Sequence, residues 1–309
     1  MTKRWLWTQK QDIGPSPRSG HAMAYDAARQ RVVLFGGETR VGRQNDTWEW
    51  DGRAWTEVAD TGPSARSFHD IVYDDARQRL VLFGGNDADG VCGDTWEWDG
   101  EDWTQVADIG LDPPRGGFAM AYDKGRRQVV LFGGLAAPGI HLNDTWAWDG
   151  TDWTQIADTG ATPRRGSAMV FDSSRKCLVL FGGTDDLSPI VFNVFNDTWE
   201  WGEDDKGWVK VQDIGPHDFG RPQMVYTGKH TVLYTSAEPG RGQGQTWEWD
   251  GRVWTQRQNM GPKAREDPAL AYDSQRDRVV LFGGLDHQGE VPHILDDTWE
   301  LAIVEQPPA

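Results

Sequence analysis

The sequence predicts an all-β protein, a six-bladed β-propeller whose last blade is closed by the N-terminal strand. Three observations support this fold. A tryptophan-rich heptad, DTWEWDG from Asp46, recurs with variations to make six copies in 309 residues. A strand-like VLFGG segment repeats at spacings of 48 to 53 residues, a period found in propeller repeats. The sixth unit lacks an outer strand, and the N-terminus can supply one.

Each unit contains four short strand patterns. In the first unit these are HAMAYD from His21, RVVLFG from Arg31, TWEW from Thr47 and WTEV from Trp55. The first two are almost continuously apolar, as strands buried on both faces are, so we place them nearest the centre. Four-stranded sheets repeated radially form a propeller. We expect a single domain over 1–309, with repeats at 18–65, 66–114, 115–163, 164–218, 219–264 and 265–309, and with 1–17 supplying the outer strand of the last blade.

The connections between the third and fourth strands carry a turn signal. Asp-Gly pairs stand there in four units, beginning at Asp51, Asp99, Asp149 and Asp250. Asp-Gly provides the positive φ that a two-residue hairpin needs. The sixth unit ends in DTWELAIVEQPPA without this pair, and the N-terminal WLWTQKQDIGPSPR matches the outer strand of the other units. Closure by this strand removes the exposed sheet edges of an open array.

Paired glycines after a strand, with a tryptophan further on and a period near 50 residues, resemble the kelch repeat. The resemblance covers essentially the whole chain, because all six units agree except for the YTS that replaces FGG at Ser236. In kelch-type adaptor proteins, arginines at the start of each unit and a hydroxyl residue before the third strand hold acidic peptides. The matching arginines are Arg18, Arg66, Arg115, Arg164 and Arg265, and the matching hydroxyls are Thr47, Thr95, Thr145, Thr198, Thr246 and Thr298.

A comparison between the units favours a structural role for these arginines. The fifth unit has Phe219 in place of the arginine, and the same unit has Gln245 in place of the heptad aspartate. Because both residues change together, we expect Arg18 to pair with Asp46, and the other units to repeat this pair. A carboxylate–guanidinium pair is directional and would tie two strand ends within a blade.

The charge balance limits the classes of partner. Acidic residues outnumber basic ones by 48 to 31, for a formal net charge of −17. This balance argues against binding to nucleic acid or to an anionic membrane surface. No apolar run approaches the ~20 residues of a membrane span, and the N-terminus lacks the apolar core of a signal peptide. We therefore expect a cytoplasmic monomer that binds a small polar ligand or a peptide.

The connections between strands differ between the two faces of the predicted ring. The loops from the second to the third strand share little sequence, and strand order places them on one face, the upper face, together with the loops that lead into each inner strand. Variable loops on a regular scaffold usually carry function. The unrepeated candidates for ligand binding on this face are His21, His69, Arg165, Arg221, Glu266, Asp267, His141, His287 and His293.

Four of these residues form the candidate catalytic set. His21 and His69 occupy equivalent positions in neighbouring units, so both should point toward the central mouth. Glu266 and Asp267 lie in the sixth unit, which ring closure makes the neighbour of the first, so they should approach His21. A carboxylate beside a histidine can orient its tautomer for acid–base work or for a metal.

Three functions follow from these residues. We favour binding of a small polar ligand or peptide at the upper mouth, without catalysis. The first alternative is an acid–base or metal-assisted enzyme of the isomerase or lyase type, with the four residues above as its catalytic set and His21 and His69 as ligands of a divalent metal ion. The second is a protein–protein interaction scaffold that uses the apolar loop SPIVFNVFN of the fourth unit.

Overall fold

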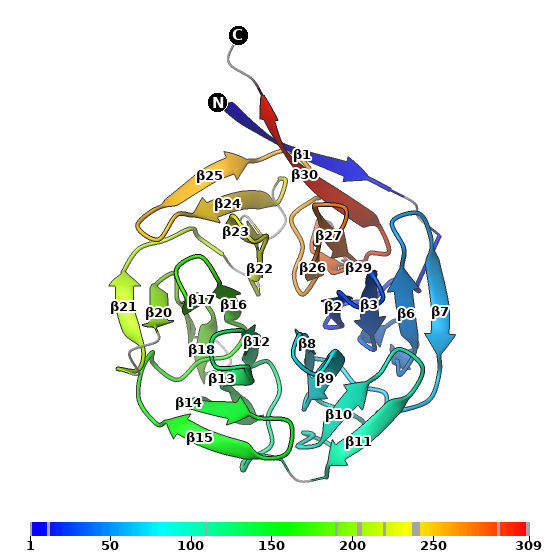
Figure 1. The fold of residues 1–309 in the computed structure, drawn as a ribbon, viewed down its shortest axis with the longest axis vertical. Coiled ribbons are helices and arrows are strands. Elements are labelled where there is room, and N and C mark those ends of the chain that lie inside the picture. The colour runs from blue at the N-terminus through cyan, green and yellow to red at the C-terminus, as the bar shows by residue number, and fades with distance from the viewer. Residues whose placement is uncertain are drawn as a thin grey trace.

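The computed structural model describes residues 2–10, 13–108, 110–188, 191–202, 206–218, 221–236, 242–288 and 291–306. These residues form 30 strands and no helix. Six four-stranded sheets surround a central axis, which confirms the six-bladed propeller (Figure 1). We call the sheets blades one to six in chain order. No helix that could cross a membrane occurs in this described part of the chain.

The four strands of each blade follow in order from the axis outward. Blade one contains β2 (Ala22–Asp26), β3 (Arg31–Phe35), β6 (Thr47–Trp50) and β7 (Trp55–Ala59). Blade two contains β8 (Asp70–Asp74), β9 (Arg79–Phe83), β10 (Thr95–Trp98) and β11 (Trp103–Ala107). Blade three contains β12 (Ala119–Asp123), β13 (Gln128–Ala137), β14 (Ile140–Trp148) and β15 (Trp153–Ala157).

The second half of the ring has the same order of strands. Blade four contains β16 (Ala168–Asp172), β17 (Cys177–Phe181), β20 (Thr198–Gly202) and β21 (Val209–Gln212). Blade five contains β22 (Gln223–Tyr226), β23 (Thr231–Thr235), β24 (Gln245–Trp249) and β25 (Trp254–Gln258). Blade six contains β26 (Ala269–Asp273), β27 (Arg278–Phe282), β30 (Thr298–Gln306) and β1 (Thr2–Gln9).

Blade six joins the first and last strands of the chain. β1 pairs antiparallel with β30 from Thr2 opposite Gln306 to Gln9 opposite Trp299, and the two strands lie side by side in Figure 1. Trp5, which has no counterpart in the repeat, is 3% exposed and belongs with Leu301 to the apolar cluster between blades five and six. The outer edge of blade six is therefore formed by a strand from the opposite end of the chain.

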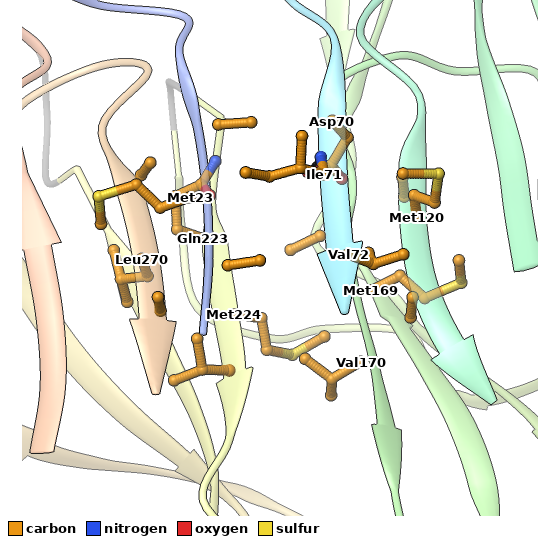
Figure 2. Close-up of a pocket in the computed structure, with 18 of the residues that line it drawn as sticks. Met23, Asp70, Ile71, Val72, Met120, Met169, Val170, Gln223, Met224 and Leu270 are labelled. Carbon is orange, nitrogen blue, oxygen red and sulfur yellow. Dashed lines mark hydrogen bonds between the residues drawn. The ribbon is translucent and has the colours of Figure 1, made fainter. Parts of the chain in front are cut away.

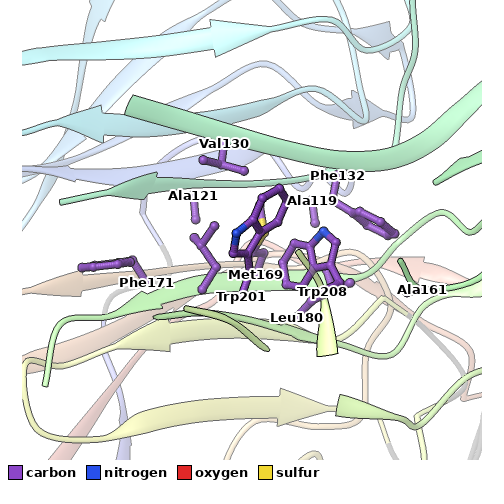
Figure 3. Close-up of a cluster of buried hydrophobic side chains, with 11 residues drawn as sticks. Ala119, Ala121, Val130, Phe132, Ala161, Met169, Phe171, Leu180, Trp201 and Trp208 are labelled. Carbon is purple, nitrogen blue, oxygen red and sulfur yellow. The ribbon is translucent and has the colours of Figure 1, made fainter. Parts of the chain in front are cut away.

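The core lies between neighbouring blades. Six clusters of buried apolar side chains each draw on two adjacent blades. In the cluster between blades three and four, Phe132 and Met169 pack with Trp201 and Trp208 (Figure 3). As in other repeat proteins, stability therefore comes from contacts between nearest neighbours.

A ring of tryptophan–threonine hydrogen bonds joins all six blades. In blade two, Trp103 Nε1 donates to Thr47 Oγ1 of blade one at 2.9 Å. The equivalent pairs are Trp55–Thr298, Trp153–Thr95, Trp208–Thr145, Trp254–Thr198 and Trp7–Thr246, at 2.8 to 2.9 Å. The threonines are at most 1% exposed. Their hydroxyls belong to the scaffold.

The predicted arginine–aspartate pairs are confirmed in five blades. Arg66 Nη1 and Nη2 donate to the two oxygens of Asp94 at 2.7 and 2.8 Å, and Nη1 also donates to the Gly84 carbonyl. Burial alone would raise the pKa of Asp94, but the bonds from Arg66 outweigh it and lower that pKa. The other pairs are Arg18–Asp46, Arg115–Asp144, Arg164–Asp197 and Arg265–Asp297.

Blade five departs from this arrangement as its sequence does. Phe219 lies outside the described residues, and Gln245 accepts a hydrogen bond from Trp247 Nε1 at 3.2 Å. In the other blades the aspartate accepts this bond, as Asp94 does from Trp96 at 2.7 Å. Gln245 therefore keeps the contact with the tryptophan and gives up the charge.

The Asp-Gly turns are longer than the predicted two-residue hairpin. Trp50 pairs with Trp55, so residues 51–54 form a four-residue loop. Gly52 has a φ of 93°, as predicted for this position, and Asp51 Oδ1 accepts the backbone N–H groups of Arg53 and Ala54 at 2.7 and 2.9 Å. The aspartate side chain thus satisfies loop donors that a two-residue turn would not contain.

Short β-ribbons rise from the upper face. They are β4 (Glu38–Thr39) with β5 (Gly42–Arg43), β18 (Thr184–Ser188) with β19 (Val191–Val194), and β28 (Leu285–Asp286) with β29 (His293–Ile294). In blade three the corresponding loop extends β13 and β14. The base of each ribbon bridges the residue after the repeated arginine position, as Arg165 does with Thr184. The variable loops of blades one, three, four and six therefore start from paired backbone around the mouth.

Candidate functional site

A series of backbone hydrogen bonds runs around the upper end of the central channel through five of the six blades. It is built from one repeat position, two residues after the arginine position. Gly20 N donates to Asp267 O, Phe68 N to Gly20 O, Gly117 N to Phe68 O, and Gly166 N to Gly117 O, at 2.6 to 3.1 Å. These bonds link blades six, one, two, three and four in turn. They hold the side chains of this repeat position near the axis.

Three blades place a side chain at this position where the other three have glycine. They are Phe68 in blade two, Arg221 in blade five and Asp267 in blade six, which we call the roof. The Arg221 guanidinium carbon lies 4.0 Å from the centroid of the Phe68 ring. Arg221 Nε lies 3.2 Å from Asp267 Oδ1, an ion pair in which both side chains are less than 20% exposed. Because blades two and five face each other in a ring of six, Arg221 crosses the axis.

Two of the roof residues hold an unfavourable backbone conformation. Phe68 and Asp267 have φ values of 60° and 50°, close to the 62° to 67° of the equivalent glycines. For residues with a Cβ this region costs about 1–3 kcal/mol. Such strain persists where the surrounding contacts impose it, and it is concentrated at functional sites.

His21 and His69 do not point into the mouth as predicted. Their side chains are 5% and 6% exposed, and their rings stand edge-to-face against Phe282 and Phe35 of the preceding blade. His69 Nε2 lies 3.1 Å from the Phe35 carbonyl oxygen. Burial, with a smaller effect of Arg66, lowers the pKa of His69 to about 3, and burial also lowers that of His21. Both histidines are neutral at pH 7 and lie in blade interfaces.

The carboxylates of blade six have partners other than the predicted His21. Glu266 Oε2 lies 3.0 Å from His287 Nε2, and both side chains are about one-third exposed. Asp267 faces Arg221 in the roof. The reason is geometric: the positive φ at Asp267 turns its side chain toward the axis, while Glu266 bridges the ribbon that carries His287.

The remaining candidates surround the roof. Arg165 is half-buried at the base of the blade-four ribbon, His141 is half-buried on β14, and His293 is exposed on β29. In the blade-four loop, Ile190 lies outside the described residues, as do the side chains of Val191 and Phe192. The ring centroid of Phe195 in that loop lies 3.9 Å from the guanidinium carbon of Arg164, so Phe195 packs on the scaffold.

Below the roof, the inner strands enclose a channel of about 450 Å³ (Figure 2). Asp70 and Gln223 line it at a position where the other four units have alanine. Burial raises the pKa of Asp70 to about 7, against a smaller lowering by the Ile71 and Met120 amides. Phe68, Asp70 and Gln223 were not among the site residues predicted from the sequence. The signal was present, since each of them breaks a repeat of glycine or alanine.

The described residues contain no cluster of three or more histidine, cysteine, aspartate or glutamate side chains suited to a metal. The metal-ligand role of His21 and His69 stays a prediction. Their ring nitrogens face neighbouring blades, and that of His69 already contacts a carbonyl oxygen.

A family model supplies the comparison with known proteins. The model described as the KLHDC2/KLHL20/DRC7 Kelch-repeats domain matches residues 1–124 and 52–237, together more than half of the chain. A comparison with curated proteins found no match.

Proposed function

The chain belongs to the kelch-repeat family, and we propose that its upper mouth binds a small polar ligand or a peptide segment without catalysis. Kelch domains mediate protein–protein interactions, and a peptide segment is the part of a partner that fits a mouth bordered by ribbons. The ligand would contact the roof from above and the ribbons of blades one, three, four and six from the side.

The roof is the observation that carries this proposal. Phe68 and Asp267 keep a strained backbone where glycine serves three other blades, and both side chains meet Arg221 at the axis. A scaffold alone has no need of this arrangement, because the glycine version of the same ring is present in the same molecule. The side chains, rather than the backbone, account for the departure from the repeat.

The groups around the roof can recognise both charges. Arg165 and Arg221 bring guanidinium groups to the mouth, and such groups bind carboxylates in a directional way, as Arg221 binds Asp267. The Glu266–His287 pair is about one-third exposed and can accept or donate. A peptide terminus, or a polar side chain that both donates and accepts hydrogen bonds, would find partners at the arginines and at the Glu266–His287 pair.

The contacts give less support to the enzyme alternative. Its four residues take part in four separate contacts, His21 with Phe282, His69 with Phe35, Glu266 with His287 and Asp267 with Arg221. A general base must be within hydrogen-bond reach of its substrate, and two buried histidines have little surface for this. No contact of a described residue favours the scaffold alternative over peptide binding.

A displayed library of random peptides, selected on the purified protein, tests the proposal. We expect enriched peptides to bind the wild type and to lose at least tenfold in affinity for the variant Phe68→Gly/Asp267→Gly, which places glycine at five of the six equivalent positions. The variant Asp75→Asn/Lys124→Ala is the matched control, because this exposed pair lies on the lower face.

Enrichment that survives the roof variant and is lost in the lower-face control would place binding on the other face. Equal retention in both variants would also contradict the proposal. In either case circular dichroism of each variant checks that the propeller is intact.

A further inference from the structure

The central channel is a second compartment, separated from the mouth by the roof. Its volume is about 450 Å³, within the range of small-molecule sites. At its lower end it is lined by residues that are exposed to solvent, including Asp75, Lys124 and Ser274. At its upper end the lining consists of the roof and the three glycines. The channel therefore opens on the lower face.

The middle of the channel wall is apolar and rich in methionine. Met23, Met120, Met169 and Met224 line it from four different blades, with Ile71 and Leu270 at the same level in the other two (Figure 2). Methionine side chains are unbranched and polarizable, and they adapt to ligands of varied shape. A wall of this kind would receive an aliphatic or aromatic body.

One carboxylate interrupts this wall. Asp70 Oδ1 accepts a hydrogen bond from the Ile71 backbone at 2.8 Å, and the described residues place no cationic side chain in an ion pair with it. Buried charges in proteins are normally paired, because an unpaired charge loses its hydration without compensation. Ionised Asp70 thus has no counter-charge among the described residues, and a cationic ligand in the channel would provide one.

A second polar group faces Asp70 from across the channel. Gln223 occupies the same repeat position in blade five, opposite blade two, and no hydrogen bond of its side chain occurs within the described residues. An ammonium group has three donors and no acceptor. A carboxylate and an amide oxygen on facing walls are the acceptors that such a group needs.

We propose that the channel binds a small primary amine with an apolar body, whose ammonium group pairs with Asp70 and hydrogen-bonds to Gln223 among the methionines. The site is independent of the proposed function at the mouth, because the roof lies between them. Arg221 is already paired with Asp267 in the roof and faces the channel from above.

Among the titratable groups in this part of the channel, Asp70 is the one whose pKa lies near neutrality. His69 on its own blade and His21 on the adjacent blade have lowered pKa values, to about 3 for His69. Tyr73 on β8, Tyr25 on β2 and Tyr122 on β12 have raised ones, from 10.0. With a pKa of about 7, Asp70 passes from mostly protonated to mostly ionised between pH 6 and pH 8, so amine affinity should rise about tenfold over this interval.

Methyl-labelled methionine provides a direct test with the intact chain. The probe is n-hexylamine, which stays cationic up to pH 8, and 1-hexanol is its neutral counterpart. We expect hexylamine to shift the methyl resonances of the four channel methionines with one common dissociation constant. Met260, which is 68% exposed and outside the channel, should not move. Hexanol should bind at least tenfold more weakly.

Two variants identify the carboxylate. Asp70→Asn keeps the shape of the side chain and should reduce hexylamine affinity at least tenfold while abolishing its pH dependence. Gln223→Leu should weaken binding less and leave the pH dependence in place. Asp102→Asn, on an exposed turn outside the channel, should bind as the wild type does. Equal binding of hexylamine and hexanol, or wild-type affinity in Asp70→Asn, would overturn the proposal, as would an absence of methionine shifts.

Discussion

The Arg221 guanidinium lies 4.0 Å from the centroid of the Phe68 ring and so connects two blades that face each other across the propeller axis. Every other side-chain contact described above joins neighbouring blades or strands of one blade. The contact places side chains between the channel and the mouth above it. It also depends on a phenylalanine with a φ of 60°, where three other blades have glycine.

Replacing Phe68 with glycine should change stability little. Relief of the positive φ offsets the lost cation–π contact, so we expect the free energy of unfolding to stay within about 1 kcal/mol of wild type. Urea unfolding followed by tryptophan fluorescence measures this. Phe118→Gly, one repeat position later in blade three and 6% exposed, is the control and should lose several times more. A comparable loss at Phe68 would mean that the roof mainly stabilises the ring.

Breaking the Arg66–Asp94 pair should lower the free energy of unfolding substantially. Asp94→Asn leaves a guanidinium that is 1% exposed without its counter-charge, and we expect a loss of about 3–5 kcal/mol. Because the folded-state pKa of Asp94 lies below its unfolded value of 3.8, this stabilisation is present above that pH and is lost as the pH falls further. Thermal unfolding at pH 7 checks the loss. Asp102→Asn, on an exposed turn, should leave the midpoint unchanged.

The tryptophan–threonine pair at ring closure should have the same coupling free energy as the equivalent pairs in the other blades. Trp7 and Thr246 are remote in sequence, yet their bond of 2.8 Å matches that of Trp103 and Thr47. Double-mutant cycles with Trp→Phe and Thr→Val should give coupling free energies of about 1 kcal/mol for both pairs. A coupling near zero at Trp7 alone would show that the N-terminal strand docks without this contact.

His69 should tolerate phenylalanine, because Phe118 occupies the same position in blade three and packs on Phe83 as His69 packs on Phe35. We expect a loss of at most about 1.5 kcal/mol at pH 7, for one hydrogen bond. Burial keeps the folded-state pKa of His69 near 3, below its ordinary value of 6.5, so the wild type loses stability as the pH falls below 6.5. His69→Phe should lose less between pH 6.5 and 4. Parallel pH profiles of the two proteins would contradict this assignment.

Asp70 should make stability fall with rising pH. Its pKa is raised from 3.8 to about 7, so its contribution is full below pH 3.8 and is lost as the pH rises through 7. Relative to Asp70→Asn, the wild type should lose on the order of 2–4 kcal/mol between pH 5 and 8.5. Urea midpoints across this range measure the difference. Asp75→Asn should follow the wild type, and an identical slope in Asp70→Asn would show that the carboxylate is not desolvated.

Much of the fold could be predicted because its determinants are local and repeated. The period near 50 residues, the apolar runs such as Val32–Phe35 and the paired glycines specify strands and turns without reference to the rest of the chain. The arginine–aspartate pair was also predictable, because Gln245 and Phe219 change in the same unit. Six copies of one unit made that comparison possible within a single sequence.

The sites were harder to predict because they depend on the direction in which each side chain points. His21 and Glu266 lie at the starts of inner strands of adjacent blades, yet one faces Phe282 and the other faces His287. Sequence spacing places a residue on a strand end and does not determine toward which neighbour the side chain turns. At these positions the turn is set by a positive φ and by the ribbon that pairs with the loop.

By itself, then, the sequence determined the blade, the number of blades and the residues that hold each blade together, since these follow from patterns that recur. Only the tertiary structure decided that Phe68, Arg221 and Asp267 form one roof and that Asp70 and Gln223 face each other beneath it. Curvature of the ring brings blades two and five together across the axis, and no local pattern encodes a contact between residues so far apart in the chain.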